Sequence, residues 1–303
     1  MSDTTTSLRR KTASAGDLQS VVRTMKALAA SSIGQYEASV RALADYYRIV
    51  ELGLGARFRD SEQAGVTMGR EAQTDAGAIG VVVFGSDQGL VGQFNDVVAD
   101  YAIKTLAALP GNPQLWAVGE RVHARLADAG LPPVGLLAVP NSVKAITPLV
   151  GRILVETEAR RGPSTGIRSD RDELSELHLF YNRPRSGAAY EPVSQRLLPL
   201  DDPWRRDLAE LHWPTKNLPE VMGGATTLRA LIREYLFVSL FRACAESLAS
   251  ENASRLAAMQ RADKNIDELL ENLNGTFQRL RQSGIDEELF EVISGFEALV
   301  NPR

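Results

Sequence analysis

Apolar side chains recur at alternating spacings of four and three residues through the segment 231–280. Twelve of the fifteen positions are apolar, and no proline interrupts them, so the heptad pattern predicts one long coiled-coil helix. A helix over 228–299 would be roughly 110 Å long at about 1.5 Å per residue, which predicts a shaft. Arg242, Asn252 and Asp263 are the three polar exceptions. The apolar positions are Leu231, Tyr235, Val238, Ala245, Ala249, Leu256, Met259, Ile266, Leu270, Leu273, Phe277 and Leu280.

The N-terminal segment carries the same rhythm and supplies a partner helix. Two successive steps of four residues, from 32 to 40, form a stutter that should locally relax the supercoil. Since the two segments stand at opposite ends of the chain, they are predicted to pair antiparallel, with a separate head between them. Two ordinary bundle helices remain the alternative, although such helices rarely exceed about 25 residues without caps. The positions are Leu8, Lys11, Ala15, Leu18, Val22, Met25, Ala29, Ser32, Tyr36, Val40, Leu43, Tyr47, Val50 and Leu54.

The middle of the chain alternates between strand and helix patterns, which predicts an α/β head with a parallel or mixed sheet. The whole fold is therefore expected to be an α/β head domain plus a long antiparallel coiled coil of the N- and C-terminal helices. The expected strands are 78–84, 115–118, 134–139, 176–181 and 193–200, and the expected helices between them are 93–109, 120–129 and 147–161. The expected division is a coiled-coil helix over 1–60, a linker over 61–77, the head over 78–200, a loop over 201–227 and a coiled-coil helix over 228–303.

Composition narrows the classes of function only slightly. The net charge of −4 gives no sign of nucleic-acid binding, and no apolar run reaches the length of a membrane span. The first residues lack the apolar segment of a signal peptide. The single cysteine, Cys244, lies inside the long helix and cannot form an internal disulfide, which suits the cytoplasm. We expect it to be packed or partly exposed rather than reactive.

One motif invites an enzymatic interpretation. A glycine-containing loop, 85–92, follows the first strand, and such loops can hold phosphate with backbone amides. Its spacing matches neither the dinucleotide fingerprint nor the P-loop, and a tight strand-to-helix turn explains the glycines equally well. The three histidines, 123, 178 and 212, are scattered without partners that suggest a metal site. The acidic cluster 286–288 is interpreted as a solvated helix face or the first turn of a new helix after Gly284. No catalytic constellation, cofactor site or metal site is predicted.

Four segments carry a resemblance that covers nearly the whole chain in order. The C-terminal segment 246–299, which begins ESLASENASRLAAMQ, closely resembles the C-terminal helix of the gamma subunit of F-type ATP synthases. LRRKTASAGDLQSVVRTMKALAASS, at 8–32, is similar to the N-terminal helix of that subunit. GSDQGLVGQFN, at 85–95, and QRLLPL, at 195–200, resemble segments of its head.

The resemblance implies a non-catalytic central-stalk rotor that couples ion flow through the membrane sector to ATP synthesis or hydrolysis. Its implied partners are the alpha and beta subunits of the catalytic hexamer, the epsilon subunit and the ring of c subunits, without nucleic acid. The implied location is peripheral, on the cytoplasmic face of the bacterial inner membrane. Met25, Arg255, Arg281 and Gln282 match family positions that contact beta subunits.

The chain also departs from the family pattern. Asp286 stands where the family usually has threonine, which places a charge beside the expected beta contact. Ser32, Gln88, Val91 and Phe296 are further departures, and together they suggest a divergent branch such as an alternative ATPase copy. Two other classes stay open from the residues alone: a nucleotide-dependent enzyme with a helical appendage, and a coiled-coil adaptor.

Overall fold

The structure is a computed structural model that describes residues 4–63, 78–161, 174–185, 189–200, 202–214 and 224–300. The described chain forms two compact units. Unit 1 comprises Met1–Ala29 and Leu256–Arg303, and unit 2 comprises Ala30–Arg255. Two helices, α1 (Thr5–Gln63) and α6 (Gly224–Val300), contribute to both units.

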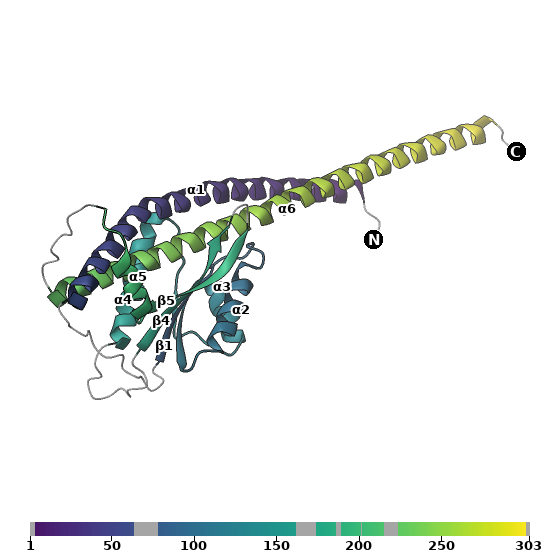
Figure 1. Cartoon of the computed structure of the whole chain (residues 1–303). Coiled ribbons are helices and arrows are strands. Elements are labelled where there is room, and N and C mark those ends of the chain that lie inside the picture. Colours follow the sequence, from purple (N-terminus) through teal and green to yellow (C-terminus); the bar gives the residue numbers. More distant parts are fainter. Residues whose placement is uncertain are drawn as a thin grey trace. The chain divides into compact units, whose positions relative to one another are not determined.

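Unit 2 contains a five-stranded mixed sheet in the order β3-β2-β1-β4-β5 (Figure 1). Its strands are β1 (Ala78–Phe84), β2 (Asn112–Val118), β3 (Gly135–Leu137), β4 (Leu174–Pro184) and β5 (Tyr190–Leu198). The central strand β1 runs parallel to both of its neighbours, whereas β4 and β5 form an antiparallel pair. The prediction of a parallel or mixed sheet is therefore confirmed.

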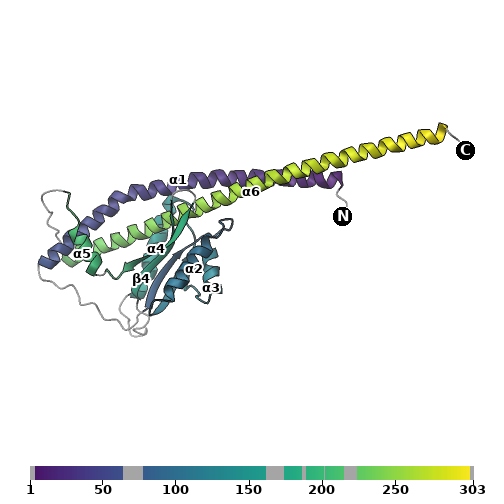
Figure 2. The same ribbon diagram turned by 45° about the vertical axis from the view of Figure 1, so that its right-hand side comes forward.

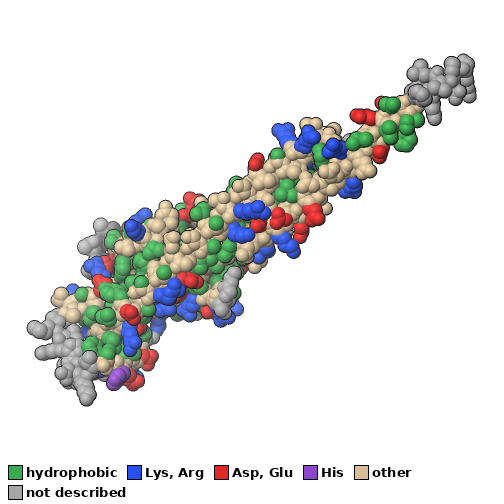
Figure 3. Space-filling view, turned by 90° about the horizontal axis from the view of Figure 1, so that it is seen from above, with side chains coloured by type: hydrophobic (Ala, Val, Ile, Leu, Met, Phe, Trp, Pro, Cys, Tyr) green, Lys and Arg blue, Asp and Glu red, His purple; other side chains and the backbone are tan. Residues whose placement is uncertain are grey.

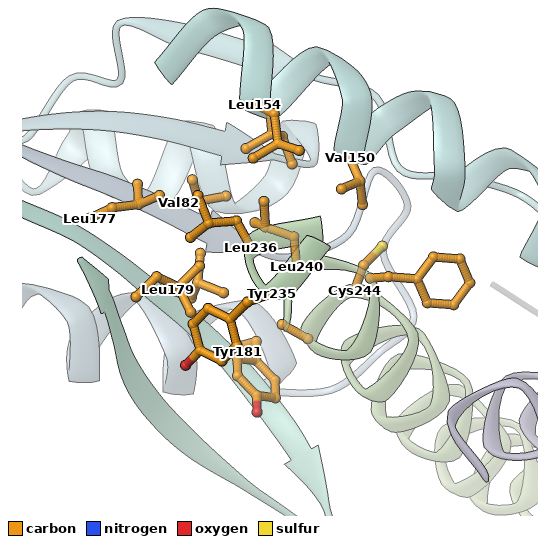
Figure 4. Close-up of a cluster of buried hydrophobic side chains, with 14 of the residues drawn as sticks. Val82, Val150, Leu154, Leu177, Leu179, Tyr181, Tyr235, Leu236, Leu240 and Cys244 are labelled. Atoms are coloured by element: carbon orange, nitrogen blue, oxygen red, sulfur yellow. The ribbon is translucent and has the colours of Figure 1, made fainter. Parts of the chain in front are cut away.

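Helices cover both faces of this sheet. α2 (Phe94–Leu106) and α3 (Glu120–Asp128) lie on one face, while α4 (Val143–Arg161) and the first part of α6 lie on the other (Figure 1). Every residue of β1 is buried, because alternate side chains enter the two different cores. Figure 4 shows the second core, where Val82 and Leu179 of the sheet meet Leu236 and Leu240 of α6.

A short helix, α5 (Asp202–Glu210), lies where the prolines of 201–227 predict a loop. Pro203 stands in its first turn, where the missing N–H of proline removes no helical hydrogen bond. Leu208 of this helix is buried, and its backbone closely approaches Gly55 of α1. The predicted loop is therefore wrong over Asp202–Glu210, because Pro203 stands in the first turn of a helix and does not prevent it.

Within unit 2, α1 and α6 pack antiparallel. Tyr46 donates a hydrogen bond to Glu234 at 2.6 Å, and the rings of Tyr47 and Tyr235 lie 6.0 Å apart. Farther along α1, Gly53 faces Leu231, so the partner number falls as the α1 number rises. The predicted antiparallel arrangement is confirmed here.

Within unit 1, the first part of α1 and the last part of α6 also run antiparallel (Figure 2). Arg23 pairs with Asp263, and the guanidinium of Arg9 lies 5.3 Å from the ring of Phe277. Every seventh position of α1 is buried, at residues 8, 15, 22 and 29. Leu18, which the predicted seam includes, is 54% exposed, because a single partner helix covers only part of the seam.

Candidate functional site

The end of α6 carries three of the five predicted contact residues. Arg281, Gln282 and Asp286 are all exposed, and Gln282 and Asp286 are four residues apart, so they share one face of the helix. The helix continues through Gly284 without a break, so the acidic cluster 286–288 is a solvated helix face and not the first turn of a new helix. The three polar side chains are therefore presented together along one continuous helix.

Large apolar side chains are exposed beside these polar ones. Phe290 is 68% exposed and Val292 is 69% exposed, and the apolar surface is visible near the end of α6 in Figure 3. Described residues from Arg281 to Ser294 are exposed almost throughout, so no described segment of the chain covers this part of α6. The apolar side chains of this run are Ile285, Leu289, Phe290, Val292 and Ile293.

The sequence interpretation missed this run as a site. A signal was present, because these apolar residues continue past Leu280 but depart from its heptad seam. Apolar residues outside a seam have no place against the partner helix, so they mark a surface that something else can cover.

A groove of about 580 Å³ adds to the apolar surface of unit 1. Leu18 of α1 and Leu269 and Leu273 of α6 line it, together with Arg10 and Lys11 of α1. The groove lies where α1 and α6 only partly cover each other's apolar seam. Unit 1 therefore exposes apolar side chains both along the helix pair and on the single helix beyond it.

Met25 occupies a different environment. It is half-buried and packs against a small core in unit 1 that includes Val22 and Met259. Part of its side chain still reaches the surface, so Met25 both packs within the coiled coil and borders its outer face.

Arg255 lies in a network of its own helix within unit 2. Its guanidinium is 2.5 Å from Glu251 and donates to Asn252 at 3.1 Å, and its side chain is 14% exposed. Burial raises the pKa of Glu251, and the neighbouring Arg255 opposes that rise. Burial likewise raises the pKa of Tyr36, which faces the same network from α1. The structure does not bring Arg255 together with Arg281 and Gln282, which lie in unit 1.

The glycine loop 85–92 uses its polar groups to hold itself in place. The backbone N–H of Ser86 donates to Asn95 at 2.9 Å, and Asn95 donates to the Ser86 hydroxyl at 2.8 Å. Asp87 accepts hydrogen bonds from the backbone N–H groups of Glu120 and Val139. A Cβ at Gly85 would lie 2.4 Å from that of Val122, so glycine permits the close approach of α3. This geometry favours the tight turn over a phosphate-binding loop.

One histidine has a partner that the sequence interpretation overlooked. His178 lies 2.6 Å from Glu176, because residues two apart in a strand share one face of the sheet. Within the described residues, no group of three or more metal-ligating side chains comes together. Within those same ranges, no helix has both the length and the apolar content that crossing a bilayer requires.

The fold comprises a mixed α/β sheet domain and two long helices, α1 and α6, from the two ends of the chain, which pack antiparallel to each other. Comparison with known families matches the model described as ATP synthase over residues 4–299, so the chain belongs to the ATP synthase family. The resemblance seen in the sequence is thereby confirmed.

Two relatives that match along nearly their whole length are ATP synthase gamma chains. The chain is 26% identical to the ATP synthase gamma chain of Sorangium cellulosum, over 97% of this chain and 98% of that one. It is 27% identical to the ATP synthase gamma chain of Mycolicibacterium paratuberculosis, over the whole of both chains.

Solved structures share the fold. A rotor chain of the Euglena gracilis mitochondrial ATP synthase matches with a TM-score of 0.60 at 14% identity, covering 92% of this chain and 97% of that one. A central stalk and c-ring structure of the Tetrahymena thermophila enzyme contains a chain that matches with a TM-score of 0.54 at 18% identity, covering 80% and 99%. The predicted fold class is confirmed by these similarities.

Proposed function

We propose that this chain is the central-stalk rotor subunit of an F-type ATP synthase. It is a non-catalytic subunit that couples ion flow through the membrane sector mechanically to ATP synthesis or hydrolysis in the alpha–beta hexamer. Membership of the ATP synthase family and the full-length similarity to gamma chains support this function. The antiparallel helices of unit 1 suit a stiff element that changes the relative free energies of partner conformations by contact.

The observation that carries the proposal is the apolar surface of unit 1. Among the described residues, nine of the fifteen large apolar side chains that are exposed belong to unit 1, although it has far fewer residues than unit 2. Removing apolar surface from water contributes about 25 cal/mol per Å², against which the entropic cost of association is set. The exposed apolar side chains of unit 1 therefore favour a surface that partner proteins cover, and the proposed partners are the alpha and beta subunits.

The proposed contacts with the beta subunits combine polar and apolar side chains. Arg281, Gln282 and Asp286 are exposed and free to meet a partner, with Ile285 between them on the same helix. Met25 reaches the outer face of unit 1 and can contribute an apolar contact. Arg255 is mostly buried, so its proposed contribution to the contact is limited to its exposed edge.

The remaining proposals concern the head and the location of the complex. The head, over 78–200, is proposed to bind the epsilon subunit and the ring of c subunits. We propose that the coiled coil consists of 1–60 and 228–303, and that a linker over 61–77 and the segment 201–227 connect it to the head. The chain is peripheral to the membrane as part of the stalk, and we place it on the cytoplasmic face of a bacterial inner membrane. No cofactor is required for this mechanical function.

The experiment that tests this function is assembly with the alpha and beta subunits. We expect one copy of the chain to be captured by each hexamer, and the assembled complex to hydrolyse ATP. Turnover of ATP by the isolated chain would instead indicate a nucleotide-dependent enzyme. Binding to other proteins without capture by the hexamer would indicate a coiled-coil adaptor.

A double substitution tests the proposed contact site. Arg281→Ala with Gln282→Ala should slow ATP hydrolysis by the complex roughly tenfold, because charge-assisted hydrogen bonds to a partner are worth about 1.5–3 kcal/mol each. The matched control is Gln260→Ala with Arg261→Ala, an exposed pair of the same residue types on the same helix. Equal rates in the two double variants would remove Arg281 and Gln282 from the site while leaving the family assignment intact.

A further inference from the structure

Two serines of α6 connect this helix directly to the backbone of the head, by which we mean the sheet with α2, α3 and α4. The Ser250 hydroxyl donates to the backbone carbonyl of Asn182, at the end of β4, at 2.9 Å. The Ser254 hydroxyl donates to the backbone carbonyl of Val91, in the glycine loop, at 2.5 Å. Both serines are buried, and they are four residues apart, so they lie on the same face of α6.

The groups that accept these bonds are themselves held firmly. The Asn182 side chain donates to the backbone carbonyl of Phe94 at 2.9 Å, which joins β4 to the start of α2. Asp87 anchors the glycine loop to the start of α3 and to the segment after β3. Val91 is 2% exposed. The two serines therefore bind a part of the head where hydrogen bonds join β4 to α2, and join the glycine loop to α3 and to the segment after β3.

Directional bonds differ from apolar packing in the motion that they resist. Apolar contacts hold α6 on the sheet, but the hydrophobic effect has no preferred direction, so it offers little resistance to small rotations that keep the apolar face of the helix covered. A hydrogen bond weakens steeply when its angle departs from linearity, so it resists rotation and sliding. Two such bonds one helical turn apart on a single face fix the rotational setting of α6 against the head.

The position of these bonds along α6 also affects how rotation passes from the head to the helix. Ser254 comes one residue before Arg255, the last α6 residue of unit 2, and from Leu256 onward the helix belongs to unit 1. Ser250 and Ser254 thus act at the end of the stretch that the head supports. Any rotation of the head must be passed to α6 before the helix leaves that stretch.

We propose that Ser250 and Ser254 are positioning residues that lock α6 to the head, so that rotation of the head turns α6 without slip. This inference rests on the proposed rotor function. It assigns part of the transmission of torque out of the head to two hydroxyl groups and two backbone carbonyls, those of Asn182 and Val91, beside the ion pair between Glu246 of α6 and Arg183 of β4. The glycine loop then serves as a mechanical anchor for the long helix.

The test uses the assembled complex in sealed vesicles with Ser250→Ala and Ser254→Ala combined. We expect ATP hydrolysis to continue, while the number of ions pumped per ATP hydrolysed falls at least about twofold. Ser254→Thr keeps a hydroxyl donor at this position. With Ser250 unchanged, this variant should retain most of the pumping of the unmodified chain. Ser39→Ala is the matched control, because the Ser39 hydroxyl donates to the carbonyl of Tyr36 within its own helix.

The outcomes separate this inference from the proposed function. Pumping and hydrolysis that fall together, in proportion to the amount of complex assembled, would mean that the serines only stabilise the fold, and the inference would be wrong. Unchanged pumping per ATP in the double variant would also overturn it. Failure of the unmodified chain to assemble with alpha and beta subunits would reject the rotor function itself. Melting curves of the isolated variants show whether each one folds, and the Ser254→Ala single variant serves if the double one does not.

Discussion

Lys26 and Asp263 form an ion pair across the two helices of unit 1, with 2.9 Å between the Lys26 Nζ and the Asp263 Oδ2. The other carboxylate oxygen lies 3.1 Å from the Nε of Arg23. Asp263 stands on the apolar seam of α6, and its side chain is only 13% exposed. A polar residue in a coiled-coil seam sets the register of the helices at a cost in stability, and its two cationic partners explain why Asp263 is tolerated.

Asp263→Asn should lower the stability of the chain at pH 7. The hydrogen bond from Lys26, together with that from Arg23, holds the pKa of Asp263 below its ordinary value. A carboxyl with a lower pKa in the folded state contributes stability above its unfolded pKa of about 3.9, and the contribution is lost as the pH falls through the folded pKa. The difference in urea midpoint between the variant and the unmodified chain should therefore shrink as the pH is lowered below about 4.

Asp267→Asn is the control for that measurement. Asp267 lies 3.7 Å from Arg23 and is 60% exposed, so solvent screens its interaction. We expect a smaller change in midpoint than for Asp263→Asn at pH 7. Equal changes would show that the seam position gives Asp263 no special weight.

Alanine should have opposite effects at two glycines of α1. At Gly55, an added Cβ would lie 2.2 Å from the carbonyl oxygen of Leu208, so α5 would have to move, and such overpacking costs about 1–3 kcal/mol. At Gly16, no atom lies within 4 Å of an added Cβ, and alanine in a helix interior is favoured by about 0.5–1 kcal/mol. Urea denaturation should move the midpoint down for Gly55→Ala and up for Gly16→Ala. The same direction for both would refute the close contact with α5.

Much of this architecture follows from local patterns in the sequence. The heptads predict α6, and short apolar runs that alternate with helical patterns predict the strands of the sheet, because these signals depend on neighbouring residues. The partners of Asp263 could not be predicted, since they depend on the register between helices whose contacting residues are 237 positions apart. The hydrogen bond of Ser254 could not be predicted for the same reason, because it depends on how α6 meets a loop 163 positions earlier. The exposed residue Arg281 could be proposed as a contact residue only by resemblance, since its proposed partner is another chain.

Cys244 should resist alkylation in the folded chain. Its side chain is 1% exposed, and burial raises the pKa of the thiol, with Glu251 adding to the rise. Because the thiolate is the reactive form, labelling with iodoacetamide at pH 8 should be roughly 100-fold slower, or more, than in denaturant. Gln260→Cys in a Cys244→Ala chain provides an exposed control on the same helix. Comparable rates at positions 244 and 260 would contradict the burial of Cys244.

Cysteines at positions 19 and 267 should crosslink within one chain. Gln19 donates a hydrogen bond to Asp267 in unit 1, which places the two positions face to face. Gln19→Cys with Gln260→Cys is the matched control, because position 260 lies seven residues, or about 10 Å, along α6 from 267. Oxidation should give an intramolecular product for the first pair only, visible by electrophoresis without reductant. Products that join two chains, with no intramolecular product, would contradict antiparallel pairing within the chain.

Glu246→Gln should destabilise unit 2 by about 1–2 kcal/mol. The Glu246 carboxylate is 8% exposed and lies 2.7 Å from Arg242 of its own helix and 3.6 Å from Arg183 of β4. Arg242 donates a charge-assisted hydrogen bond to Glu246, whereas Arg183 forms only an ion pair with it. Such a hydrogen bond contributes about 1.5–3 kcal/mol, and we discount that range because both arginines are about half exposed. The urea midpoint of the full chain measures the loss.

The control for Glu246 is Glu37→Gln in the same unit. Glu37 lies 3.8 Å from Arg41, and both side chains are exposed, so this change should cost less than about 0.5 kcal/mol. Salt separates the two cases further, because 1 M NaCl reduces the Debye length to about 3 Å and screens the exposed pair most. A cost at Glu246 that survives high salt supports a desolvated carboxylate that ties β4 to α6. A cost that disappears with salt, as at Glu37, would show that Glu246 behaves as a surface charge and that apolar packing alone holds β4 on the helix.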